Sequence, residues 1–331
     1  MHYTDIDFNT KTILITGGAG FIGSNLAFYF QKNFPTCNVI IFDKFRNEET
    51  FSNGNLKSFG HFKNLLGFHG EIISGDINCP QDTEKLKTYA FDYIFHQAAI
   101  SDTTVNDQAL MVQTNVNAFK TLLDMAASMN ANMIYASSAA TYGVSDTFSI
   151  GYEQPNNVYG FSKLMMDNVA KKYMKKSSIS IVGLRYFNVY GEREFFKNKT
   201  ASMVLQFGLQ LLGGKNAKLF EGSDTIRRDF IYIEDVIQAN IKACKPKQSG
   251  VYNVGTGKAR SFQDIVDILK NELEIKRDDV YIPNPFVGQY QFFTEADISL
   301  SEEFLEYSPR FSLEEGIKNY IKEIKRIDQN G

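Results

Sequence analysis

Two pairs of polar residues in this 331-residue chain have types and positions that suit the chemistry of an active site. Tyr159 and Lys163 stand four apart at the start of a helical pattern over 159–173, which predicts that both side chains lie on one helical face. A tyrosine has a pKa of about 10, and a nearby ammonium favours the phenolate, so the pair can act as an acid and base. By itself this spacing is more typical of an accidental surface pair.

The second pair, Ser137 and Ser138, follows an apolar run at 133–135 that predicts a strand. A hydroxyl at the carboxyl end of a strand can hold a substrate oxygen. The alternative is that the two serines cap the next turn, because serine side chains readily bond to nearby backbone N–H groups.

A glycine-rich turn, 16–23, closes the first apolar run and opens a helical pattern, which predicts a dinucleotide site. Glycines permit the tight bend, the close approach of backbone to phosphate and the packing of helix on strand. Asp43 ends the next apolar run and suits a ribose 2′-hydroxyl, hence NAD. The adjacent Lys44 and Arg46 could instead neutralise the 2′-phosphate of NADP, so these residues leave the cofactor open.

The elements that must position these groups alternate between strand and helix patterns. Strand-like runs occur at 12–15, 39–42, 71–74, 93–95, 133–135 and 179–184, with helical spacing at 21–31, 112–128 and 159–173. This alternation predicts a parallel sheet covered on both faces, with ligands bound at the carboxyl ends of its strands.

Beyond residue 190 the elements become shorter and are interrupted by glycine and proline, which predicts a second, smaller unit. Segments 233–245 and 251–254 still resemble a helix and a strand of the first unit. We therefore expect a dinucleotide-binding domain of residues 1–187 plus about 233–257, and a discontinuous substrate domain of about 188–232 plus 258–331.

Composition argues against several functional classes. A net charge of −3 and a hydrophobic content of 43% provide no basic excess for nucleic acid, and no apolar stretch approaches the roughly 20 residues that span a bilayer. The first residues lack a targeting pattern, so we expect a cytoplasmic protein. Cys37, Cys79 and Cys244 are too few and too far apart for a disulfide framework or a zinc site, and we expect no metal.

Taken in order, these motifs resemble the extended short-chain dehydrogenase/reductase family. Its glycine turn, its serine after a middle strand and its Tyr-x-x-x-Lys pair all occur here, and the resemblance continues through 135–143, 185–191, 218–223 and 228–232. The family implies a Rossmann-type doubly wound parallel sheet with a smaller C-terminal α/β unit, a bound NADP, with NAD possible, and a homo-oligomeric protein.

The resemblance is to the members that act on nucleotide sugars, and among them to those that invert C6 of ADP-D-glycero-D-manno-heptose. The implied reaction is a transient oxidation to the 6-ketone, followed by reduction on the opposite face. A UDP-hexose 4-epimerase is the alternative, and a non-catalytic NADP sensor is an alternative of another class. A dehydratase is disfavoured because Ala139 and Ala140 occupy the place of its usual Asp-Glu pair.

Each orientation of the intermediate requires its own proton donor, so two bases are expected. The resemblance assigns them to Tyr159 and Lys197, with Lys199 as the rival of Lys197. It also implies that Ser138 bonds the reacting oxygen, and that Lys163 holds the nicotinamide ribose and lowers the pKa of Tyr159.

The remaining implied contacts fall into two groups. The cofactor residues are Gly17, Gly20, Phe21, Ile22, Gly23, Asp43, Lys44, Asp76, Ile77, Gln97, Ala98, Ala99, Asn115, Lys163 and Val189, with His96 either a contact or a structural loop residue. The substrate residues are Ser101, Asn188, Lys199, Gln206, Phe220, Glu221, Gly222, Ser223, Arg228 and Tyr290.

The chain departs from the family pattern near the second base. Glu192 replaces a proline, Phe195 and Phe196 replace small and polar residues, and Gln206 replaces a common histidine. We therefore expect the loop before Lys197 to be shaped differently.

Overall fold

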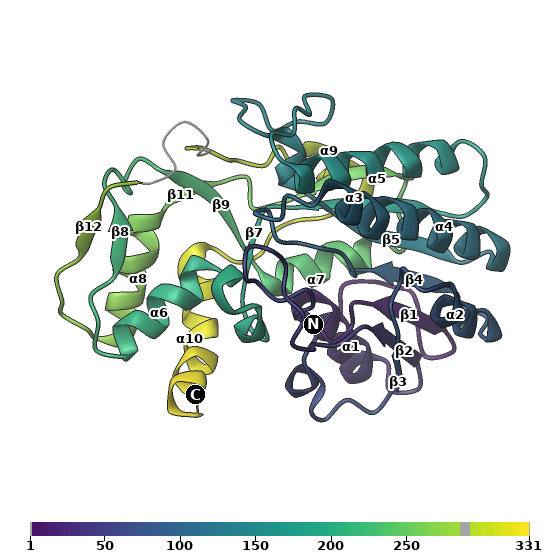
Figure 1. Ribbon diagram of the computed structural model, residues 1–331, viewed down its shortest axis with the longest axis horizontal. Helices are drawn as coiled ribbons and strands as arrows, with labels where there is room; N and C mark the ends of the chain where they lie inside the picture. Colours follow the sequence, from purple (N-terminus) through teal and green to yellow (C-terminus); the bar gives the residue numbers. More distant parts are fainter. Residues whose placement is uncertain (1, 285–291, 331) are drawn as a thin grey trace.

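The computed structural model describes residues 2–284 and 292–330 (Figure 1). Within this part, seven parallel strands form one sheet in the order β10-β6-β5-β4-β1-β2-β3. The strands are β1 (Thr12–Thr16), β2 (Asn38–Asp43), β3 (Glu71–Ser74), β4 (Tyr93–His96), β5 (Asn132–Ser138), β6 (Ile181–Tyr186) and β10 (Gly250–Val254). Each lies in a segment with a strand-like pattern, so the predicted doubly wound parallel sheet is confirmed. The strand order reverses between β1 and β4, where such sheets bind their ligands.

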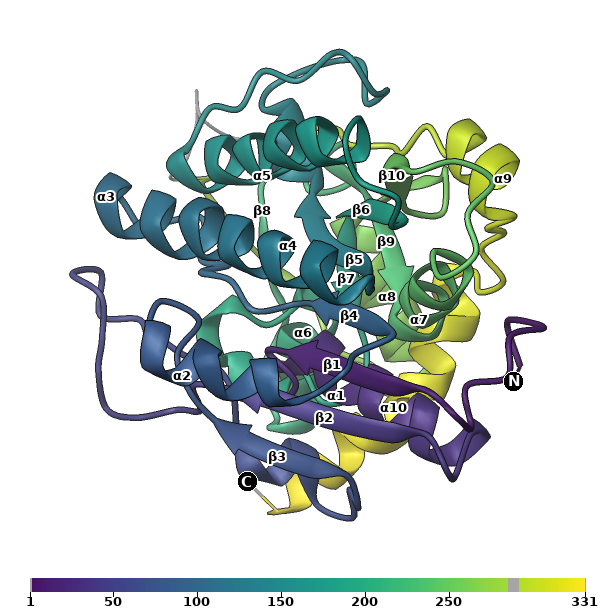
Figure 2. The same ribbon diagram turned by 90° about the vertical axis from the view of Figure 1, so that its right-hand side faces the viewer.

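Side chains alternate along the strands, so apolar residues point to both faces of the sheet, and helices cover both faces. Ile13 and Ile15 of β1 pack in the core on the side of α1 (Phe21–Asn33) and α7 (Ile233–Lys242). Leu14 packs in the core on the opposite side, with α4 (Ala118–Met129) and α5 (Val158–Met174), which run side by side in Figure 2. Two short helices, α2 (Pro80–Glu84) and α3 (Gln108–Met111), precede α4.

The second group of elements lies at the left of Figure 1. One small sheet has the order β11-β9-β7 and another pairs β12 with β8. Their bounds are β7 (Asn188–Tyr190), β8 (Lys218–Phe220), β9 (Arg227–Tyr232), β11 (Ala259–Ser261) and β12 (Val280–Ile282). Three helices that contact one another accompany them, namely α6 (Met203–Leu212), α8 (Phe262–Leu273) and α10 (Leu313–Asn330), while α9 (Ser299–Leu305) packs against β10.

The chain passes between the two groups more than once. After β9, α7 packs against α1 and β10 joins β6 at the edge of the large sheet. These contacts support the proposed division into residues 1–187 plus about 233–257 and about 188–232 plus 258–331. The apolar core is nevertheless continuous, because one cluster contains Leu26 of α1 together with Leu269 of α8 and Ile324 of α10.

Two features concern the described residues only. None of their helices is both long and apolar enough to cross a bilayer. Among the same residues, no group of three or more His, Cys, Asp or Glu is arranged to hold a metal ion. The three cysteines carry free thiols, and Cys244 is buried.

Candidate active site

A cavity of about 530 Å³ lies at the carboxyl ends of the large sheet's strands. Every predicted catalytic and cofactor residue lines it except Asn115 and His96, the latter expected as either a contact or a structural residue, so loops that follow five different strands meet there. Of the predicted substrate residues that the structure describes, only Ser101 lines this cavity. The cavity therefore brings together the Tyr-Lys pair, Ser138, the glycine turn and Lys197.

The glycine turn fits a pyrophosphate because its backbone packs too closely for side chains. A Cβ atom on Gly17, whose φ is +70°, would lie 2.7 Å from the backbone nitrogen of Ala98. A Cβ atom on Gly23 would lie 2.3 Å from the carbonyl oxygen of Gly17. Helix α1 starts here with Gly20 as its N-cap, without a side-chain cap bond, so the helix N-terminus offers backbone N–H groups to an anion in the cavity.

Asp43 supports the turn through two backbone bonds. Its Oδ2 accepts from the N–H of Ala19 at 2.9 Å and its Oδ1 from the N–H of Phe45 at 2.7 Å. Burial raises the pKa of Asp43, and the two N–H bonds oppose that shift. The carboxylate is thus a structural part of the turn as well as a residue that lines the cavity.

Two lysines line the cavity together with Asp43, and each is paired with a carboxylate. Lys44 lines the cavity and pairs with Asp76 at 2.9 Å. Lys57 also lines it and pairs with Glu49 at 3.6 Å. The sequence analysis missed Lys57, because the polar connection between β2 and residue 62 has no periodic pattern that predicts its path. A backbone bond from the Arg46 N–H to the Gly60 carbonyl, 2.7 Å long, folds this connection back toward the cavity.

Helix α5 presents Tyr159 and Lys163 to the cavity as its spacing predicted. The Nζ of Lys163 donates to the carbonyl of Ala136 at 2.7 Å and lies 5.9 Å from the centroid of the Tyr159 ring. Burial lowers the pKa of Lys163 to about 8, with Asp167 opposing the shift. Burial raises the pKa of Tyr159, while its hydrogen bond with Ser138 lowers it. The expected depression of the phenol pKa by Lys163 is therefore not the dominant effect here, since desolvation is stronger.

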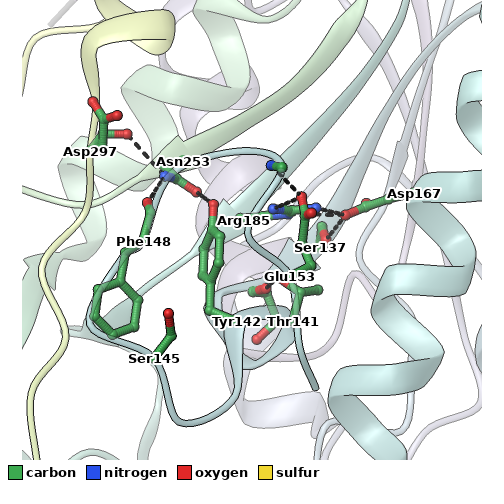
Figure 3. Close-up of polar contacts among 12 residues, drawn as sticks. Ser137, Thr141, Tyr142, Ser145, Phe148, Glu153, Asp167, Arg185, Asn253 and Asp297 are labelled. Atoms are coloured by element: carbon green, nitrogen blue, oxygen red, sulfur yellow. Dashed lines mark hydrogen bonds and ion pairs between the residues drawn. The ribbon is translucent and has the colours of Figure 1, made fainter.

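A buried ionic network centred on Arg185 includes Asp167 of the same helix α5 (Figure 3). Asp167, one turn after Lys163, accepts from Arg185 at 2.8 and 3.0 Å and from the hydroxyls of Ser137 and Tyr135 at 3.1 and 2.9 Å. The fully buried Arg185 also pairs with Glu153 at 2.7 Å. The network ties α5 to β5 and β6 and engages Ser137 as a support.

Ser138 caps the next turn and also lines the cavity. Its Oγ accepts from the N–H of Ala140 at 3.1 Å, which caps the next turn, and its hydroxyl also contacts Tyr159. The capping expectation is thus confirmed for Ser138, and its bond to a substrate oxygen stays a prediction.

Two predicted cofactor neighbours lie behind the cavity wall. Asn115 is fully buried, and its amide bonds the N–H and the carbonyl of Ile100 at 2.8 and 3.0 Å, so it holds the loop after β4. His96 ends β4, bonds the Thr16 hydroxyl at 2.7 Å and stacks on Phe119. Burial lowers the pKa of His96 to about 3. Both residues support the glycine turn and its neighbouring loop.

The structure separates the two candidate second bases. Lys197 is half-buried and lines the cavity, with its Nζ 5.5 Å from the Phe21 ring, whereas Lys199 is exposed and does not line it. Asn198, at φ 51° and ψ −124°, interrupts the short helical segment η5 (Phe195–Thr200) between them. Burial lowers the pKa of Lys197, and Glu194 opposes that shift.

The remaining predicted substrate residues belong to the second group of elements. Asn188 lies on β7, beside β9, which carries Arg228; Arg228 is 7% exposed and donates to the carbonyl of Arg227 at 3.0 Å. Gln206 donates to the carbonyl of Ala201 at 2.7 Å and so braces the segment between η5 and α6. Phe220, Glu221, Gly222 and Ser223 follow one another from the end of β8, and Tyr290 lies outside the described residues.

Comparison with known proteins identifies the scaffold. Residues 13–255 match the model of the NAD dependent epimerase/dehydratase family. The chain belongs to this family. It is 51% identical to ADP-L-glycero-D-manno-heptose-6-epimerase of Helicobacter pylori, over 98% of this chain and 99% of that one, with a TM-score of 0.90.

More distant family structures share the same architecture. UDP-glucose 4-epimerase of Thermotoga maritima is 26% identical (96% and 99% of the two chains, TM-score 0.84). UDP-glucuronic acid 4-epimerase of Bacillus cereus, in complex with UDP-glucuronic acid and NAD, is 28% identical (96% and 99%, TM-score 0.80). The chain is accordingly a nucleotide-sugar epimerase, and its cofactor is NAD or NADP. The glycine turn and the open N-terminus of α1 fit such a dinucleotide.

Proposed function

We propose that this epimerase converts ADP-D-glycero-D-manno-heptose into ADP-L-glycero-D-manno-heptose by inverting C6. The observation that carries the proposal is that Tyr159 and Lys197, two proton-transfer groups from separate segments, line one cavity with the glycine turn. The 51% identity to the Helicobacter pylori enzyme supports this sugar and this nucleotide.

The two groups suit a reaction through a ketone. A C–H bond next to an ordinary hydroxyl is not acidic, and a bound nicotinamide dinucleotide supplies the reversible hydride acceptor that such a carbon needs. In one orientation of the sugar, Tyr159 moves the proton of the C6 oxygen; after the intermediate turns over, Lys197 does so from the other side. We expect Ser138, which bonds Tyr159, to bond the same oxygen, while the Nζ of Lys163 lies 5.9 Å from the centroid of the Tyr159 ring.

The decisive measurement is NMR of the C6 epimers formed from ADP-D-glycero-D-manno-heptose. We expect Tyr159→Phe and Lys197→Ala each to nearly abolish the conversion, while Lys199→Ala, a matched change of an exposed lysine two residues away, retains most of it. Full activity of Lys197→Ala would overturn the two-base assignment.

Two other outcomes would overturn the substrate or the route. Turnover of a UDP-hexose, without change in the heptose, would favour a 4-epimerase, which the likeness to two UDP-sugar 4-epimerases makes the second candidate. Incorporation of solvent deuterium at C6 would exclude an internally returned hydride.

We further propose NADP as the cofactor. The carboxylate of Asp43 is engaged by two backbone N–H groups, while Lys44 and Lys57 line the same cavity and could pair with a 2′-phosphate. A hydrogen bond to a charged group contributes about 1.5–3 kcal/mol, so Lys57→Ala should weaken NADP binding about 10- to 100-fold and leave NAD binding within about twofold. Calorimetric titration with both dinucleotides measures this; equal weakening of the two would refute it.

A homo-oligomer is the final part of the proposal. The strand β12 carries three consecutive exposed apolar side chains, of which Tyr281 is 52% exposed, and exposed apolar strands are typical contact surfaces between chains. Light scattering during size-exclusion chromatography should give a multiple of 37.5 kDa. A monomer at every concentration tested would contradict it.

A further inference from the structure

Phe196, the residue immediately before Lys197, is held by residues from a distant connection. Its ring stacks on the imidazole of His61, with 3.7 Å between centroids and 3° between planes. The guanidinium carbon of Arg46 lies 5.7 Å from the Phe196 ring centroid, and the same guanidinium donates a hydrogen bond to the Phe196 carbonyl. Parallel aromatic stacking and an ionic donor thus act on a single residue.

The connection that supplies Arg46 and His61 also builds the cavity wall. It runs from β2 to η1 (Phe62–Leu65), and its residues Lys57 and Gly60 line the cavity. The N–H of His61 donates to the carbonyl of Ala19 at 3.0 Å, which fixes this connection to the glycine turn. The connection therefore lies between the glycine turn and the loop of Lys197.

A second set of bonds, made by Glu194, anchors the loop of residues 191–202 that carries Lys197. Glu194 is fully buried, and its carboxylate accepts from the N–H and the hydroxyl of Ser202, both at 2.7 Å, and from the N–H of Gly191 at 3.2 Å. These bonds fix the two ends of the loop. Lys197 lies between these two ends of the loop, next to the strained Asn198. Phe196 is therefore the residue nearest to Lys197 that fixes the loop to the cavity wall.

We propose that Phe196 is a positioning residue for Lys197, acting through its stack on His61 and its carbonyl bond to Arg46. This rests on the proposed function, in which Lys197 is the second base. The stack on His61 keeps Lys197 at the cavity. His61 belongs to the connection from β2 to η1, which itself lines the cavity. The stack also gives a role to the Phe-Phe pair by which this chain departs from its family pattern.

The test compares kinetic constants of matched variants, with the C6 epimers followed by NMR on the cofactor-loaded protein. Small displacements of a catalytic group cost one to two orders of magnitude in rate. Phe196→Ala should therefore lower kcat about 10- to 100-fold, with KM changed by less than about threefold. Phe196→Tyr, which preserves the stack, should restore at least about half of the wild-type kcat.

Phe62→Ala is the matched control, because Phe62 also stacks on His61, at 4.8 Å, but is 60% exposed and remote from Lys197 in sequence. It should stay within about twofold of wild type. The inference is overturned if Phe196→Ala keeps its kcat, if Phe196→Tyr does not restore it, or if Phe62→Ala is equally slow. It is also overturned if added NADP alone restores Phe196→Ala, since the stack would then retain cofactor. Full activity of Lys197→Ala would instead refute the proposed function, whatever Phe196 does.

Discussion

Replacing Asp167 by asparagine should destabilise the protein strongly, because this carboxylate neutralises an arginine that solvent does not reach. Both Asp167 and Arg185 have fully buried side chains, joined at 2.8 Å. Removing one partner of a buried ion pair costs about 3–5 kcal/mol, since the other charge remains without its counterion. Glu153, 2.7 Å from the other guanidinium nitrogen, places the expected loss toward the lower end, at about 3 kcal/mol.

A double-mutant cycle tests whether the pair itself is responsible. Asp167→Asn and Arg185→Met should each lower the free energy of unfolding by about 3 kcal/mol or more, whereas the double variant should lose less than the sum by about 1–3 kcal/mol. The chain contains no tryptophan, so urea unfolding is best followed by far-UV circular dichroism, at one fixed protein concentration.

The exposed pair Lys87–Glu84 provides the control. Its separation of 2.7 Å nearly equals that of the buried pair, but its side chains are 58% and 67% exposed. Glu84→Gln should therefore cost less than about 1 kcal/mol. The reasoning fails if Asp167→Asn costs no more than Glu84→Gln, or if the losses in the cycle simply add.

Two further changes probe the glycine turn and the histidine behind it. Gly23→Ala places a Cβ 2.3 Å from the Gly17 carbonyl, so it should cost about 1–3 kcal/mol and weaken dinucleotide binding at least about tenfold, measured by NADPH fluorescence titration; unchanged affinity would contradict this. Burial lowers the pKa of His96 to about 3, so between pH 6.5 and 3 the unfolded chain binds a proton that the folded chain does not, and stability falls as pH falls. His96→Gln should flatten this part of the stability curve, measured by urea unfolding at a series of pH values; an unchanged slope would contradict it.

Much of the large sheet and one wall of the site were predictable because their signals are local. Apolar runs predicted all seven strands of the large sheet, including β10 far along the chain. The spacing of Tyr159 and Lys163 predicted a shared helical face, and the glycine spacing predicted the turn before α1. The expected effect of Lys163 on the phenol pKa was incomplete, since the depth of burial around Tyr159 is not a local property.

The loops depend on contacts that span most of the chain. Lys197 and Lys199 are equivalent in a polar sequence, and Lys57 has no pattern of its own. Arg46 and Phe196, which join these two regions, are 150 residues apart. Asn115, a member of a helical pattern, is turned to the backbone of Ile100 by packing instead of to the cavity.

The sequence by itself therefore determined the parallel sheet, the glycine turn and the acid-base helix, because residues at periods of two and 3.6 are neighbours whatever the rest of the chain does. Only the tertiary structure decided which lysine reaches the cavity, which carboxylates serve as supports and where the connection after β2 returns. Those outcomes depend on desolvation and on bonds between distant segments, and such energies exist only once the chain has folded.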